Sequence, residues 1–128
     1  MAVNVEHSFA NASTFNLAKL SKERLISRTF CENFADFENV LKERQVTPGP
    51  GHQICSEQDL IAMLEANLGV GMLPESAPKS EKIKLLPLEG VEFSRTVFCY
   101  GVAGRQRSAA AATLIKMLRA ADWTQMAA

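Results

Sequence analysis

Residues 53–74, QICSEQDLIAMLEANLGVGMLP, predict a strand, a helix and a second strand in immediate succession. Apolar residues recur at helical spacing over positions 60–68, and Ser56 stands just before them with an acidic residue three positions later, which is the spacing of a capping box. Gly69 occupies the place where a left-handed residue commonly ends a helix. Val70–Leu73 then resumes as a short apolar run that suits a strand. The stretch therefore predicts a β-α-β unit.

The same alternation precedes this unit. Strands are predicted at Met1–Val5, Arg24–Thr29 and Gln53–Cys55. The prolines and glycines of Thr47–Gly51 predict a break in regular structure before the third strand. From Phe30 the period changes to that of an amphipathic helix lying on a sheet. Its apolar face consists of Phe30, Phe34, Phe37, Val40 and Leu41.

The remaining sequence continues with two apolar runs and a final helix. Ile83–Leu88 is apolar, and Thr96–Val102 is nearly continuous in its apolar character, which predicts a strand covered on both faces. A helix is predicted from about Ser108, with an apolar side formed by Leu114, Ile115, Met117, Leu118 and Ala121. Strands that alternate with helices indicate an α/β fold with a mostly parallel sheet.

Composition and charge bound the class of protein. The 128 residues suit one domain, and 47% hydrophobic residues are enough to bury a core. The chain has 14 Lys and Arg against 14 Asp and Glu, so its formal net charge is zero. This balance argues against a disordered polyelectrolyte and against a strongly basic nucleic-acid binder.

The cysteines and histidines indicate neither a disulfide framework nor a metal site. Cys31, Cys55 and Cys99 are odd in number and lack C-x-x-C spacing, so we expect free thiols in a reducing, cytoplasmic compartment. His7 and His52 have no second ligand at helical or hairpin spacing, so neither a metal nor a cofactor is expected. Either histidine is expected to be solvated, and the alternative is that it acts as a base for Cys31 or Cys55 as a nucleophile. Cys31 is expected to pack under its helix, and the alternative is that its thiol responds to oxidants. No basic-then-apolar leader or apolar run of roughly 20 residues is present, so no membrane association is expected.

Cys99–Arg105, CYGVAGR, resembles the C-x5-R phosphate loop of cysteine-dependent phosphatases. Such a loop holds a phosphate with backbone N–H groups and the arginine, and its thiolate attacks phosphorus. Phe98 stands where that family usually has His, and Gln106 stands where it has Ser or Thr. A small phosphatase is therefore the alternative to a chain that is not an enzyme.

Polar residues near two predicted strand ends suggest a binding edge. Arg28 and Thr29 follow a strand and precede a helix, while Ser56 and Gln58 begin the next helix. In a parallel sheet both junctions lie at the carboxyl edge, where helix N-termini attract small anions. The alternative, which the sequence leaves open, is that Ser56 only caps its helix and Arg28 only faces water.

The order of the segments resembles the effector-binding region of LysR-type transcriptional regulators. The resemblance is carried by residues 25–32 (LISRTFCE), 56–61 (SEQDLI) and 95–108, and by residues 7–10 (HSFA), which are similar to the family's H-P-L/F-A loop. Its most specific part is MLEANLGVGMLP at 63–74, which is similar to the family's A-G-x-G-V-x-x-L-P, with Asn67 and Leu68 where the family often has Ala-Gly or Gly-Leu.

The resemblance implies a three-layer, Rossmann-like lobe of the periplasmic-binding-protein type II fold. Residues 14–92 would form the second lobe of a two-lobed clamp, and 1–13 and 93–128 would supply crossing strands and a C-terminal helix of the first lobe. The chain would then be a single effector-binding lobe that lacks the family's winged helix-turn-helix. DNA contact is expected only through that absent domain.

The same resemblance implies a non-enzymatic sensor of a small metabolite. The cleft positions of the family correspond here to Arg28, Thr29 and Ser56, whose donors suit an anionic ligand. The terminal helix would lack its sheet, so we expect a homodimer that buries either this helix or the hydrophobic run from Val97.

Overall fold

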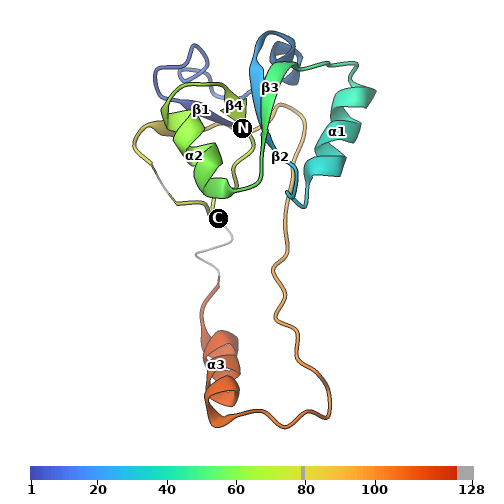
Figure 1. The fold of residues 1–128 in the computed structure, drawn as a ribbon, viewed down its shortest axis with the longest axis vertical. Coiled ribbons are helices and arrows are strands. Elements are labelled where there is room, and N and C mark those ends of the chain that lie inside the picture. Colours follow the sequence, from blue (N-terminus) through green and yellow to red (C-terminus); the bar gives the residue numbers. More distant parts are fainter. Residues whose placement is uncertain (79, 124–128) are drawn as a thin grey trace. The chain divides into compact units, whose positions relative to one another are not determined.

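The structure is a computed structural model that describes residues 1–78 and 80–123 (Figure 1). It divides into two units: unit 1 is Met1–Arg95, and unit 2 begins at Thr96. The strands are β1 (Ala2–Asn4), β2 (Arg24–Arg28), β3 (Gly49–Ile54), β4 (Val70–Gly71) and β5 (Ile83–Leu85). The helices of the described residues are the 3-10 helix η1 (Leu17–Lys22) and the α-helices α1 (Phe34–Glu43), α2 (Glu57–Glu65) and α3 (Ala109–Ala120).

Unit 1 is built on a mixed five-stranded sheet with the order β3-β2-β4-β1-β5. β2 pairs in parallel with β3 on one side and with β4 on the other. β1 lies antiparallel between β4 and β5. The predicted α/β class is confirmed, and the parallel part of the sheet is the part formed by β3, β2 and β4.

α1 and α2 cover opposite faces of this sheet. Successive residues of a strand point to opposite faces. Val3 of β1 belongs to the core cluster that contains Phe37 of α1, whereas its neighbour Ala2 belongs to the cluster that contains Leu60 of α2. The sheet therefore lies between two helical layers, as expected for a three-layer lobe (Figure 1).

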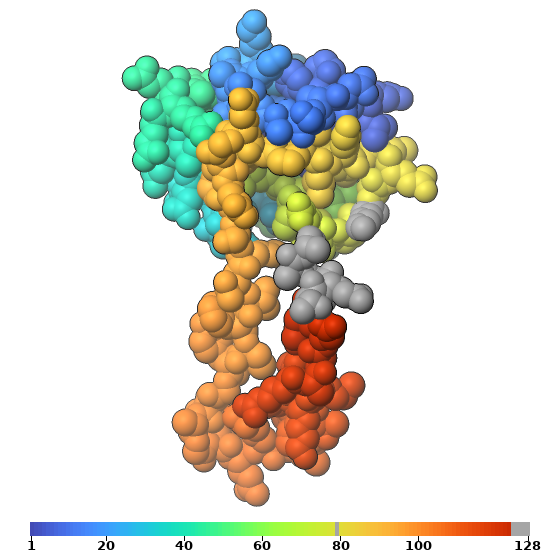
Figure 2. All heavy atoms as spheres, turned by 180° about the vertical axis from the view of Figure 1, so that it is seen from behind, coloured from blue at the N-terminus to red at the C-terminus, as the bar shows by residue number. Residues whose placement is uncertain are grey.

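The segment that follows β5 packs back against α1. The rings of Phe37 and Phe93 meet edge to face with 6.0 Å between their centroids. Arg44 donates hydrogen bonds to the carbonyl oxygens of Glu89 and Gly90 at 3.0 and 2.8 Å. Figure 2 shows this segment crossing the surface beside α1.

α1 begins later than the periodicity predicts. Residues between β2 and α1 form turns, in which the N–H of Cys31 donates to the carbonyl of Arg28 and the N–H of Phe34 donates to that of Cys31. Phe30 is consequently outside the helix and 85% exposed, so its assignment to the buried helical face was wrong. Phe37 is buried as predicted.

β3 begins inside the segment where the sequence predicts a break. β3 is an edge strand, and an edge strand tolerates Pro50 because the missing N–H can face away from the ladder. A Cβ on Gly51 would lie 2.0 Å from the carbonyl oxygen of Leu25, so this glycine allows β3 to approach β2 closely.

The predicted glycine cap of α2 is replaced by an asparagine. Asn67 has the positive φ of 54° that ends the helix. Gly69 serves close packing instead, because a Cβ there would lie 2.3 Å from the carbonyl oxygen of Arg24.

The first residues of the chain hold α2 and β5 to the centre of the sheet. The buried Asn4 donates its side-chain amide to the carbonyls of Leu64 and Glu65, at 3.0 and 2.9 Å, and so satisfies the last turn of α2. The amino group of Met1 donates to the carbonyl of Leu86 at 2.6 Å. Burial lowers the pKa of this amino group to about 6.

Unit 2 contains α3 but not the predicted strand. Residues 96–102 form no strand, and Val97 and Tyr100 are 85% and 88% exposed. A strand needs hydrogen-bonded neighbours, and no described residue forms a ladder with this segment. α3 starts after Ser108 as predicted, and it buries none of its residues.

Candidate functional site

The carboxyl ends of β2 and β3 lie side by side at one edge of the sheet. Arg28, the last residue of β2, is in register with Ile54, the last residue of β3. The N–H of Thr29 donates to the carbonyl of Ile54 at 3.3 Å. Ser56 follows two residues later as the N-cap of α2. The fold therefore brings Thr29 and Ser56 to the same edge.

Ser56 caps α2 with both of its hydrogen-bonding functions. Its hydroxyl oxygen accepts from the N–H of Asp59 at 3.0 Å, and the hydroxyl donates to the Asp59 carboxylate at 2.7 Å. The capping box is thus closed through the two side chains rather than through the Ser56 N–H. The backbone N–H groups of the first turn of α2 that precede Asp59 have no acceptor within the helix, and they lie at the edge of the sheet.

Arg28 does not simply face water. Its Nη1 donates to Glu57 Oε2 at 2.9 Å, and the two side chains are 15% and 29% exposed. Its Nη2 lies 3.9 Å from the sulfur of Cys31. The ion pair ties the end of β2 to the first residue of α2 and fixes the guanidinium at the edge.

Two residues of the edge present polar side chains to solvent. Thr29 and Gln58 are both exposed, one from the end of β2 and the other from the first turn of α2. Together with the N-terminus of α2 they form an open surface of hydrogen-bond donors and acceptors. We call this surface, formed by Arg28, Thr29, Ser56 and Gln58, the β2–α2 edge.

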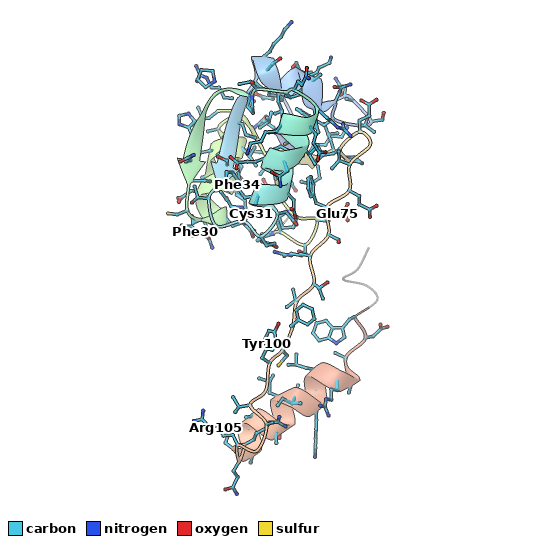
Figure 3. The ribbon with its side chains drawn as sticks, turned by 90° about the vertical axis from the view of Figure 1, so that its right-hand side faces the viewer. Phe30, Cys31, Phe34, Glu75, Tyr100 and Arg105 are labelled. Carbon is cyan, nitrogen blue, oxygen red and sulfur yellow. The ribbon has the colours of Figure 1, made fainter. Side chains whose placement is uncertain are left out.

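Next to the β2–α2 edge lies a small pocket with a volume of about 20 Å³. Its lining residues are Leu25, Ile26, Ser27, Arg28, Cys31, Phe34, Phe37 and Met72. Phe30, Cys31 and Phe34 lie together where β2 leads into α1 (Figure 3). Such a pocket holds about one water molecule and not a metabolite, so a larger ligand would lie on the edge itself.

A second ion pair stands close by along the chain. Arg95 Nη1 lies 3.4 Å from Glu32 Oε1, and its Nη2 donates to the hydroxyl of Ser76 at 2.7 Å. The backbone hydrogen bond at Glu32 and, next to it, the side chain of Arg95 hold the pKa of the Glu32 carboxyl below its ordinary value. The carboxylate of Glu32 therefore stays charged near neutral pH.

Glu57 and Cys31 are neighbours of Arg28 that the sequence pattern did not predict. An acidic residue in the first turn of a helix is most simply interpreted as a partner of the helix dipole. One feature of the sequence could have indicated the contact with Glu57. Arg28 ends one parallel strand and Glu57 follows the next, so opposite charges stand at two strand–helix junctions that share an edge of the sheet.

The residues of the C-x5-R motif do not form a phosphate loop. Cys99 lies in a segment without regular structure, and its thiol is exposed. α3 begins only at Ala109, after Arg105 and three further residues, so its N-terminus does not follow the motif directly. The phosphatase alternative has no support.

Nothing in the described residues suggests a metal centre. In residues 1–78 and 80–123 no group of three His, Cys, Asp or Glu side chains is placed to hold a metal ion. His7 instead contacts Glu23, with 3.2 Å between Nε2 and Oε2. None of the helices in the same residues has the length and apolar character needed to span a bilayer.

Comparisons with known proteins agree with this architecture. A family model described as the LysR substrate binding domain matches residues 1–123. No curated protein sequence matches the chain.

Three solved structures share the fold. The effector binding domain of QuiR in complex with shikimate is 13% identical, with a TM-score of 0.70, over 90% of this chain and 56% of its own. HinK, a LysR family transcriptional regulator from Pseudomonas aeruginosa, is 19% identical, with a TM-score of 0.67, over 92% of this chain and 42% of its own. The CcmR regulatory domain of Synechocystis PCC6803 in complex with 2-PG is 15% identical, with a TM-score of 0.63, over 93% of this chain and 60% of its own. The chain thus spans about half the length of the proteins that it resembles.

Proposed function

The chain belongs to the LysR substrate-binding domain family, and from that premise we propose that it is the ligand-sensing part of a LysR-type transcriptional regulator. It binds a small, anionic metabolite at the β2–α2 edge and releases it unchanged, without acting as an enzyme. A cytoplasmic site of action fits its free thiols, Cys31, Cys55 and Cys99.

The observation that carries this proposal is the juxtaposition of Thr29 and Ser56. The hydrogen bond from Thr29 to Ile54 aligns the two strand ends. Parallel α/β sheets bind ligands outside the carboxyl ends of their strands, where helix N-termini supply N–H donors. Shikimate is bound by the effector domain of QuiR, and it is a carboxylate with several hydroxyl groups, for which such an edge is suited.

We assign residues 14–92 to the second lobe of a two-lobed clamp, and 1–13 and 93–128 to the crossing strands and terminal helix of the first. The boundary between unit 1 and unit 2 after Arg95 supports a division of the chain near residue 92. A ligand held between two lobes favours their closed arrangement, and this population shift alters the geometry of the DNA-binding part of the regulator. DNA contact belongs to that other part.

Titration with shikimate, followed by backbone amide NMR, tests the proposed site. Thr29→Val removes the exposed hydroxyl with little change of shape and should weaken binding by about two- to ten-fold, the worth of one hydrogen bond. Thr47→Val makes the same change at an exposed threonine between α1 and β3 and should leave the Kd unaltered. An unchanged Kd in Thr29→Val, or an equal loss in Thr47→Val, would contradict the assignment of the site.

Self-association is the second part of the proposal. Unit 2 exposes large apolar side chains, among which Tyr100 is 88% exposed and Met117 64% exposed. Apolar surface of this kind favours association by leaving water, so we propose a homodimer that buries it. Sedimentation velocity should show a dimer that Met117→Glu dissociates, while a strictly monomeric chain at high concentration would refute it.

A further inference from the structure

We propose that Glu57 sets the charge selectivity of the β2–α2 edge by acting as an internal competitor for Arg28. This inference rests on the proposed function and deepens it. An anionic ligand that binds Arg28 Nη1 must displace the Glu57 carboxylate, whereas a neutral ligand that uses the hydroxyl of Thr29 does not meet this competition.

Glu57 contacts Arg28 directly. Arg28 Nη1 donates to Glu57 Oε2 at 2.9 Å, which is the length of a charge-assisted hydrogen bond. Both side chains are largely withdrawn from water, at 15% and 29% exposed, so screening by solvent is weaker than for a surface pair. The carboxylate therefore occupies the position that a ligand carboxylate would need.

Arg28 keeps donors that lack a strong acceptor. Its Nε is enclosed and has no hydrogen-bond partner in the part of the chain that the structure describes. Among the same described residues, its Nη2 contacts the sulfur of Cys31 alone, at 3.9 Å. Glu57 thus satisfies one end of the guanidinium, and Nη2 would gain from an incoming oxyanion, which the enclosed Nε would not contact.

The first turn of α2 carries negative charge. Glu57 and Asp59 both stand there, and Asp59 is held by the hydroxyl of Ser56. Two carboxylates offset the positive end of the helix dipole, so the N-terminus of α2 attracts an anion less than an uncharged first turn would. Removing the charge of Glu57 both frees Arg28 and restores part of this attraction.

The test compares shikimate with its neutral methyl ester in the wild-type chain and in Glu57→Gln. We expect Glu57→Gln to lower the Kd of shikimate by about five-fold or more, which corresponds to about 1 kcal/mol. The Kd of methyl shikimate should change by less than about two-fold. Glu38→Gln removes the same charge from the exposed face of α1 and should move neither value.

A second variant ties the effect to Arg28. In Arg28→Lys/Glu57→Gln the gain for shikimate should fall, because lysine cannot offer the planar set of donors. Amide spectra of each variant check that the fold is kept.

Two outcomes overturn the inference, and they are distinguishable. If the wild-type chain binds shikimate but Glu57→Gln binds it no more tightly, the competitor role is wrong and the proposed site stands. If neither chain binds shikimate in a saturable way, both the competitor role and the proposed site are wrong.

Discussion

α2 and α3 begin in the same way and end in different environments. Each follows a serine N-cap whose hydroxyl accepts the N–H three residues on, at 3.0 Å from Asp59 in α2 and 3.2 Å from Ala111 in α3. α2 buries Leu60 and Leu64 completely, whereas α3 buries no residue. Local sequence therefore determines where a helix starts, whereas packing against a sheet determines whether its apolar residues are buried.

The same contrast holds for an apolar run in each of the two units. Ile26 of β2 is 1% exposed in the centre of a parallel ladder, while Val97 of unit 2 is 85% exposed. Residues that bind a ligand need a rigid support, and the packed unit 1 provides one at the β2–α2 edge, where we propose that the ligand binds.

The largest expected difference between the two helices is in the cost of removing a leucine. Leu64→Ala leaves a cavity between α2 and the sheet and should reduce the free energy of unfolding by about 2–5 kcal/mol. Leu114→Ala, at a residue that is 56% exposed, should change it by less than about 0.5 kcal/mol. Urea unfolding measures both, and an equal loss in the two variants would show that α3 is packed.

Unit 1 should also acquire a pH dependence from its buried amino group. The pKa of the Met1 amino group is lowered to about 6 from 8.0 because burial disfavours the charged form, against a smaller opposing effect of Glu75. The folded state therefore binds fewer protons than the unfolded state between these values, and stability should rise with pH from 6 to 8. The full gain is about 2–3 kcal/mol for a shift of this size.

Urea unfolding at several pH values measures this gain. Acetylation of the amino group removes the titrating group, so the acetylated chain should lose this part of the pH dependence. An identical pH profile in both forms would mean that the amino group is not buried in the folded chain.

Replacing a glycine by alanine should destabilise unit 1 more than unit 2. Gly69→Ala places a Cβ against the carbonyl of Arg24 and should cost about 1–3 kcal/mol, because β4 and β2 must move apart. Gly101→Ala in unit 2 meets only the end of the flexible Arg107 side chain and should be close to neutral. Thermal unfolding distinguishes them, and a tolerated Gly69→Ala would contradict the close approach of the two strands.

The smallest effect is expected from the two caps. Ser56→Ala should lower the free energy of unfolding by about 1 kcal/mol, since it leaves the N–H of Asp59 without its acceptor. Ser108→Ala should reduce the helix signal of α3 in circular dichroism without moving the urea midpoint of unit 1. A shift of that midpoint would show that α3 stabilises unit 1.

Local chemistry made the starts of α2 and α3 predictable, whereas α1 begins later than its periodicity predicts. The cap Ser56 and the start of α3 near Ser108 were evident because each depends on residues near in sequence. The strand predicted at Thr96–Val102 failed because a strand depends on a partner elsewhere, and hydropathy alone does not show whether that partner is present.

The candidate site was predictable in outline only. Thr29 and Ser56 could be placed at one edge because parallel neighbours share a carboxyl end. The partner of Arg28 was not predictable, since a contact across two junctions depends on the rotation of α2 about its axis, which one-dimensional spacing does not fix.

The most direct test of the account compares amide shifts at the two serine caps during a shikimate titration. The account predicts saturable shifts at Thr29 and Ser56, at the β2–α2 edge, and none at Ser108, the equivalent cap of α3. Shifts of equal size at both caps, or none at Thr29 and Ser56, would contradict it.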